Sequence, residues 1–241
     1  MFRNAWSRTK YSKKRKIDTF SHDIDGNKIY RHGIRPLLIF YSGTDVYFLN
    51  CRSVKEYSNK FPGEVKVKFQ NSDISSFINT SSIQVMDNAK FFKIYRKNDI
   101  TDDNKLSYED TKDIINELNN RLDSDYLTIQ RISINEKYKS VNEVLFSTKI
   151  ENDLPLNENF DKRYLVQTNE SVATVLHLRA LIKHLKVMDD EELTNYRNAE
   201  NLDEYMYKNY NGYRSKNDYI KVLNQITEPE NKEEVKSKLS L

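Results

Sequence analysis

The sequence predicts an α+β fold in which a small antiparallel barrel, or a strongly bent antiparallel sheet, is followed by a mainly helical region. Four or five short apolar or alternating segments follow one another within about sixty residues, with no convincing helix between them. The composition changes at the polar segment 98–104, and helical patterns dominate after it. We therefore expect a basic flexible arm at 1–16, a β-barrel domain at 17–98 and a mainly helical region at 99–241.

The centre of the predicted barrel is a β-hairpin. Leu37–Tyr41 and Val46–Leu49 are apolar and aromatic runs, and the residues between them include the Gly and Asp of a tight reversal. Residues 64–69 alternate strictly between apolar and charged side chains, which predicts a half-buried antiparallel strand. The rest of the barrel is expected to hold a polar connection at 71–80 and two further apolar segments, one at 81–86 and one at 89–96.

Helical periodicity marks the second half of the chain. An N-cap at Ser107 followed by acidic residues predicts a helix over 107–122. A second helix starts at Thr168–Ser171 and carries a broad apolar stripe over 172–188. The shorter elements are an extra strand or extended segment near 126–134, a short helix at 140–146, a loop at 153–161 and a docked helix at 218–226.

The charge of the chain is unevenly distributed. The formal net charge is +3, but residues 1–16 carry seven cations and no acid, so the remainder sums to 3 − 7 = −4. The cations of this arm are Arg3, Arg8, Lys10, Lys13, Lys14, Arg15 and Lys16. Such an arm either follows a phosphate backbone or anionic partner, or is a solvated leader.

Several classes of protein are disfavoured by the composition. A single cysteine, Cys51, excludes an internal disulfide and a cysteine-based zinc cluster, and fits a reducing compartment. No apolar run approaches the length of a membrane span and the N-terminus lacks an apolar signal core, so we expect a cytoplasmic protein with no membrane partner. His177 and His184 are too far apart along a helix to bind one metal, so we expect interface or surface histidines.

Two polar side chains flank the predicted hairpin. Arg35 precedes the first strand and Ser53 follows the second, and antiparallel pairing brings such ends together. A guanidinium and a hydroxyl would then share one rim, beside His32, which is the nearby group that titrates near neutral pH. The simpler alternative is that Arg35 is a solvated charge, Ser53 begins a turn and His32 shapes a loop.

Three short motifs follow one another along the predicted barrel. They are Gly33–Pro36 before an apolar strand, Asn50–Ser53 at the end of a strand, and Ser81–Ile83, which runs into Met86–Asp87. In this order and spacing they resemble the MazF/PemK family of toxin endoribonucleases, which are SH3-like barrels, and more distantly the ToxN/AbiQ type. The resemblance covers residues 28–96.

The resemblance implies metal-independent cleavage of single-stranded RNA without a cofactor. The ribose 2′-hydroxyl attacks the adjacent phosphate and leaves a cyclic phosphate. By position, Arg35 is the catalytic arginine that stabilises the charge of the phosphorane, and Ser53 is its hydroxyl partner. His32 is the candidate for proton transfer, and Lys55 resembles the lysine of the Ser-x-Lys arrangement in the ToxN type.

The resemblance also implies a setting and partners. The setting is a bacterial toxin–antitoxin, defence or mobile-element system, with a cognate antitoxin and a homodimer formed through the barrel. Attraction of RNA to the mildly acidic body is assigned to a local basic patch made of Arg52, Lys55, Lys60, Lys66 and Lys68. Residues 99–241 have no counterpart in the family. We expect them to occlude the RNA groove, to regulate the activity, or to replace catalysis by binding. A non-catalytic protein- or nucleic-acid-binding module on the same barrel is therefore the alternative.

Overall fold

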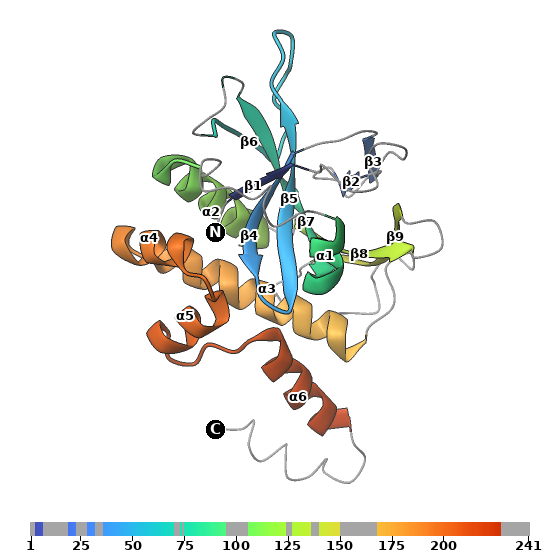
Figure 1. Cartoon of the computed structure of the whole chain (residues 1–241), viewed down its shortest axis with the longest axis vertical. Coiled ribbons are helices and arrows are strands. Elements are labelled where there is room, and N and C mark those ends of the chain that lie inside the picture. Colours follow the sequence, from blue (N-terminus) through green and yellow to red (C-terminus); the bar gives the residue numbers. More distant parts are fainter. Residues whose placement is uncertain are drawn as a thin grey trace.

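The computed structural model describes residues 3–6, 19–22, 28–31, 36–69, 73, 75–94, 106–123, 127–135, 140–149 and 168–227. A curled sheet occupies the centre; α2 (Tyr108–Asp123) lies beside it, and the later helices of the C-terminal region lie at its lower end in the view of Figure 1. The long helix α3 (Asn169–Val187) crosses the sheet near one end of its central hairpin (Figure 1). The predicted α+β fold, with a curled, mostly antiparallel sheet followed by helices, is confirmed.

The sheet is built around three neighbouring strands of the N-terminal half. In pairing order its strands are β1 (Arg3–Trp6), β4 (Pro36–Ser42), β5 (Asp45–Ser53), β7 (Ser76–Asp87), β8 (Thr128–Asn135) and β9 (Ser140–Lys149), and β6 (Glu64–Val67) also pairs with β7. The short strands β2 (Thr19–His22) and β3 (Lys28–Arg31) form a separate pair. Among the described strands only β7 and β8 pair in parallel, and their crossover contains two helices.

The predicted hairpin is present as β4 and β5. Leu37 pairs with Asn50, and Ser42 pairs with Val46 at the turn. Alternate residues of β4 contribute to two different core clusters, Leu38 to one and Leu37 to the other, because successive side chains in a strand point to opposite faces. Both faces of the hairpin are therefore buried, which explains its continuous apolar runs.

Strand β7 bends sharply at its middle. Leu49 pairs with Ile83 and Cys51 pairs with Ile78, so residues 79–82 of β7 lie opposite the single residue Asn50. Before the bend β7 pairs with β6, and after it β7 pairs with β8. A bulge of this kind increases the local twist of a strand, and it produces the curl of this sheet. β7 starts at Ser76 rather than at the predicted residue 81, because pairing with β5 and β6 outweighs the weak strand propensity of its polar residues.

Two segments adopt a different structure from the one predicted. The apolar segment at 89–96, counted as a further strand, instead forms helix α1 (Asn88–Ile94), which begins where Asp87 Oδ1 accepts a hydrogen bond from the Lys90 amide. The short helix expected at 140–146 is wrong, since strand β9 covers these residues and pairs antiparallel with β8. A short apolar pattern fits either a helix or a strand. Capping at Asp87 favours the helix in α1, and pairing with β8 favours the strand in β9.

The helices predicted at 107–122, 172–188 and 218–226 are confirmed. The described helices after α1 are α2 (Tyr108–Asp123), α3, α4 (Asp190–Asn198), α5 (Leu202–Asn209) and α6 (Lys216–Thr227). At the start of α3, Thr168 and Ser171 exchange side-chain and backbone hydrogen bonds in a capping box. The apolar stripes of α2 and α3 belong to the core cluster that also contains Leu38 of β4, so the C-terminal region shares the core of the sheet. No described helix is long and apolar enough to cross a membrane.

Gly63, just before β6, allows the close approach that the bend requires. Its φ is +79°, and its carbonyl accepts hydrogen bonds from the Thr80 amide at 2.8 Å and the Thr80 hydroxyl at 2.7 Å. A Cβ at this position would lie 2.0 Å from Ser81 Oγ. We expect Gly63→Ala to lower the free energy of unfolding by about 3 kcal/mol, the sum of backbone strain and overpacking, in urea denaturation.

Gly212 is the matched control for this substitution. Its φ is +80°, but nothing lies within 4 Å of an added Cβ. Gly212→Ala should therefore lower the free energy of unfolding by only about 1 kcal/mol, through backbone strain alone. Equal losses in the two variants would contradict a tight contact between residue 63 and β7.

Candidate functional site

Of the predicted catalytic residues, Ser53 lies at the open end of the β4–β5 hairpin. Arg35 and His32 lie outside the described residues. Ser53 is the exposed last residue of β5 and pairs with Ser76. Lys55 is also exposed, in a turn where its amide donates to Ser58 Oγ at 2.9 Å. Of the predicted catalytic set, the structure thus describes Ser53 alone, at the rim and open to solvent.

Arg52, predicted as a substrate-binding residue, has its donors engaged within the protein. Its side chain forms a bidentate pair with Glu64, with Nε–Oε1 and NH2–Oε2 distances of 2.6 and 2.5 Å. NH2 also donates to the carbonyl of Asn59 at 2.5 Å. Arg52 is 9% exposed, so this buried pair ties the loop after β5 to the start of β6.

Two aromatic rings enclose the Arg52 guanidinium. Its central carbon lies 4.8 Å from the centroid of Phe61 and 4.3 Å from that of Phe77. The Phe61 amide also donates to Glu64 Oε2 at 2.9 Å. Phe61 nevertheless remains 53% exposed, and Tyr57 in the same loop is 89% exposed. The loop therefore presents aromatic side chains, one of which is held from beneath by a charged group.

The strand register assigns these residues to two faces. Arg52 pairs with Phe77, which pairs with Lys66, and paired residues point to the same side of a sheet. Ser53 follows Arg52 and so points to the opposite side. Lys66 and Lys68 are exposed. The structure thus brings Lys66 and Lys68 to the face of Arg52 and not to the face of Ser53.

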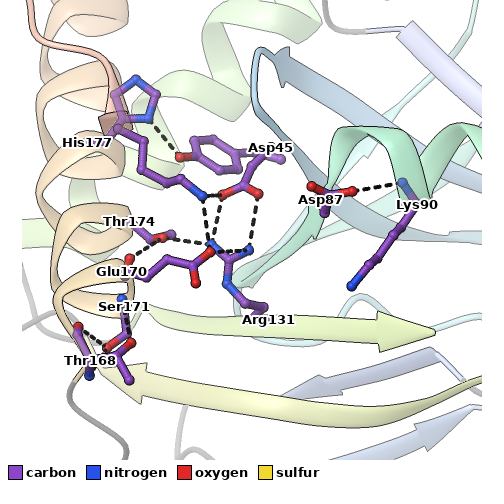
Figure 2. Close-up of polar contacts among 11 residues, drawn as sticks. Asp45, Asp87, Lys90, Arg131, Thr168, Glu170, Ser171, Thr174 and His177 are labelled. Carbon is purple, nitrogen blue, oxygen red and sulfur yellow. Dashed lines mark hydrogen bonds and ion pairs between the residues drawn. The ribbon is translucent and has the colours of Figure 1, made fainter. Parts of the chain in front are cut away.

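A buried polar cluster that the sequence did not reveal lies at the other end of β5. Asp45, which is 2% exposed, accepts two hydrogen bonds from Arg131 at 3.1 and 2.8 Å (Figure 2). Lys216 Nζ lies 2.6 Å from the same carboxylate and 3.3 Å from Glu170 Oε1. Arg131 also donates to Thr174 Oγ1 at 2.8 Å. This Asp45 cluster, made of these five residues, connects β5, β8, α3 and α6.

The charges of the Asp45 cluster neutralise one another. Burial opposes ionisation of Asp45, but the hydrogen bonds and charges of Arg131 and Lys216 hold the pKa of its carboxyl below the usual value. Two cations face two carboxylates, one of which, Glu170, remains half exposed. We interpret the cluster as the attachment of α3 and α6 to the sheet.

A second buried network runs from β5 to α5 through His177. Tyr47 OH lies 2.7 Å from His177 Nδ1, and Tyr213 OH lies 2.9 Å from His177 Nε2. Tyr213 and Tyr41 both donate to Asp203 Oδ1 at 2.6 Å. The hydroxyl proton of Tyr213 is donated to Asp203, so the Tyr213 oxygen accepts a hydrogen bond from His177 Nε2–H. The other ring nitrogen, Nδ1, then accepts from the Tyr47 hydroxyl. These five residues form the His177 chain, and their geometry is satisfied by a neutral histidine.

The surface position considered for His177 is wrong. The side chain is fully buried between the sheet and the loop after α5, and burial lowers its pKa to about 4. His184 is partly buried and lies against the Tyr210 ring, with 5.2 Å between ring centroids. Its pKa is also lowered by burial. The signal for His177 was present in the sequence, since it occupies the apolar stripe of α3.

Neither a metal centre nor a relative provides an independent assignment. Among the residues that the structure describes, no group of three or more His, Cys, Asp or Glu side chains is placed to hold a metal ion. No family model, curated protein or solved structure matches this chain. The function is therefore argued from the geometry of the rim.

The Asp45 cluster generates a prediction about stability. Asp45→Asn would leave Arg131 and Lys216 buried beside a neutral amide, and loss of one partner from a buried ion pair costs about 3–5 kcal/mol. We expect a decrease of that size in the free energy of unfolding in urea. As a control, Lys183→Met breaks the exposed pair with Asp123 and should change stability by less than about 1 kcal/mol. A similar small change in both variants would contradict the anchoring role of Asp45.

The His177 chain predicts a specific loss of stability in acid. The folded pKa of about 4 lies below the ordinary 6.5, so the unfolded state binds more protons between these values. Stability should be complete above pH 6.5 and fall towards pH 4, by about 3 kcal/mol from this residue. His177→Gln should remove this component from a pH series of urea unfolding curves, whereas His184→Gln should retain it. An unchanged pH profile in His177→Gln would contradict a buried neutral imidazole.

Proposed function

We propose that this chain is a toxin-like, metal-independent endoribonuclease that binds single-stranded RNA at the open end of its β4–β5 hairpin. The observation that carries this proposal is the position of Ser53, which is exposed at the end of β5, two residues before the exposed Lys55. The proposed partner of Ser53 comes from the segment that precedes β4. Leu37 pairs with Asn50, and Arg35 and Ser53 lie two and three positions beyond these residues in the sequence.

The proposed reaction needs few groups. The 2′-oxygen of the ribose attacks phosphorus, the bond from phosphorus to the 5′-oxygen breaks, and the products are a 2′,3′-cyclic phosphate and a 5′-hydroxyl. Arg35 stabilises the negative charge of the phosphorane, and Ser53 contributes a hydroxyl beside it. His32 accepts the proton of the 2′-hydroxyl or returns one to the leaving oxygen. Lys55 adds a phosphate contact without sequence preference.

The proposed setting is a bacterial toxin–antitoxin, defence or mobile-element system. A curled, mostly antiparallel sheet at the centre of the chain supports an SH3-like barrel of the MazF/PemK type as the ancestral unit. A cognate antitoxin would then hold the activity in check, and the barrel would pair in a homodimer. The N-terminal arm would add electrostatic attraction for RNA.

The second candidate is a binding module without catalysis, built on the same sheet. It is favoured by the separation of faces described above, since Lys66 and Lys68 share a face with Arg52 and not with Ser53. The described residues of the rim, Ser53 and the neighbouring lysines, include no imidazole. The proposed proton transfer therefore depends on His32, which lies outside the described residues. This candidate predicts RNA binding with no strand cleavage.

Growth and cleavage assays test the proposed activity. Expression of the full chain should arrest bacterial growth, and purified protein should cleave single-stranded RNA in the presence of a chelator to give cyclic phosphate ends. Arg35→Ala combined with Ser53→Ala should lower the cleavage rate by at least about 100-fold, the loss typical of removing one stabilising donor. Lys112→Ala, in an exposed pair on α2, is the matched surface control and should leave the rate unchanged.

The assay separates the two candidates. Toxicity or cleavage that persists in the double variant would contradict the assignment of Arg35 and Ser53. Binding of RNA by wild-type protein without any cleavage would favour the binding module instead.

A further inference from the structure

We infer that Phe61 is a stacking platform for an unpaired base of single-stranded RNA, held in position by Arg52 and flanked by Lys66 and Lys68. This inference rests on the proposed function for the identity of the bound polymer and adds the residue that contacts its bases. The relevant surface, the Phe61 face, consists of Phe61, Arg52, Phe77, Lys66 and Lys68. It lies on the side of the sheet opposite to that of Ser53.

The position of Phe61 is fixed before any ligand arrives. The Phe61 ring lies against the Arg52 guanidinium, whose central carbon is 4.8 Å from the ring centroid, and the same carbon is 4.3 Å from the centroid of Phe77. Glu64 holds Arg52 with two oxygens and accepts the Phe61 amide, so backbone and side chain are both restrained. An exposed aromatic ring restrained in this way loses little conformational entropy when a ligand stacks on it.

Phe61 is exposed although its neighbour on the same face is buried. It is 53% exposed, whereas Phe77 on the same face is 4% exposed beneath Arg52. Burying an aromatic ring is favourable, and the chain instead keeps this ring at the surface in a defined orientation. Every nucleic-acid base offers a flat face to such a ring, which is how proteins bind single strands without sequence preference.

The charges around the Phe61 face fit a phosphate backbone. In residues 53–69, leaving aside Glu64, which pairs with Arg52, the charged groups are Lys55, Lys60, Lys66 and Lys68 against Glu56. Asp110 of α2 also accepts a hydrogen bond from the Lys68 amide, which gives 4 − 2 = +2. Arg52 is neutralised by Glu64, so it acts on the ring and not on phosphates. An exposed aromatic ring near several exposed lysines favours a single-stranded polyanion over an apolar protein surface.

Binding of an uncleavable strand tests the platform. The probe is a fluorescently labelled 2′-O-methyl oligouridine of about 12 nucleotides, which matches typical single-strand sites and has no free 2′-hydroxyl to attack phosphorus. Phe61→Ala in the full chain should weaken binding about tenfold, and Phe61→Leu, which keeps apolar volume, should weaken it similarly. Tyr207→Ala is the matched control, because Tyr207 is 50% exposed on α5, and should change affinity by less than about twofold.

A tryptophan at the platform reports stacking directly. Phe61→Trp should bind oligouridine with quenching of the new indole fluorescence, relative to wild-type protein with its single Trp6. An abasic strand of equal length should bind more weakly and cause no quenching. Lys66→Ala with Lys68→Ala should weaken oligouridine and abasic strands alike and reduce the salt dependence of binding.

Each outcome decides the inference. Equal affinities for Phe61→Ala and Tyr207→Ala, or equal binding of abasic and base-containing strands, would overturn base stacking at Phe61. Failure of wild-type protein to bind the strand would also overturn it and would favour a protein partner for this face. Because the probe cannot be cleaved, loss of nuclease activity alone leaves this result unaffected, so failure of the platform and failure of the proposed reaction remain distinguishable.

Discussion

The burial of the central strands on both faces is the constraint on which the rest of this structure depends. Helices cover one side of β4, β5 and β7, and α1 with its neighbours covers the other. Any polar group in these strands must then find a partner inside the protein, because an unpaired buried group costs several kcal/mol at most sites. Asp45 and Arg52 meet this requirement, through Arg131 and Glu64.

These internal partners give each end of β5 a different role. At the turn end, Asp45 and Tyr47 attach α3, α5 and α6 through two buried networks. At the open end, Arg52 is used to order a loop that reaches solvent with two aromatic rings. Strand β5 therefore connects the end that attaches the C-terminal helices with the end that carries the surface proposed to bind RNA.

Regular patterns in the sequence predicted the framework, while polar partners far apart in the chain could not be predicted. The hairpin, α2 and α3 follow from apolar periodicity, which depends on neighbours within a few residues. The role of Arg52 was misjudged because nothing local shows that Glu64 will capture it, and His177 was misjudged because its partners Tyr47 and Tyr213 come from other elements. Arg131 lies in the segment predicted as an extra strand or extended segment, and no local pattern indicates that it completes a buried ion pair. Arg35 and His32, which lie outside the described residues, keep the status of predictions.

The Asp45–Lys216 contact also has a consequence for folding during translation. The two residues are 171 positions apart, and bacterial and eukaryotic ribosomes add about 5–20 residues per second, so Asp45 precedes its partner by roughly 10 to 30 s. During this interval the Asp45 carboxylate lacks Lys216, so its charge is only partly neutralised. The nascent N-terminal half therefore cannot reach its final stability until α6 has been synthesised.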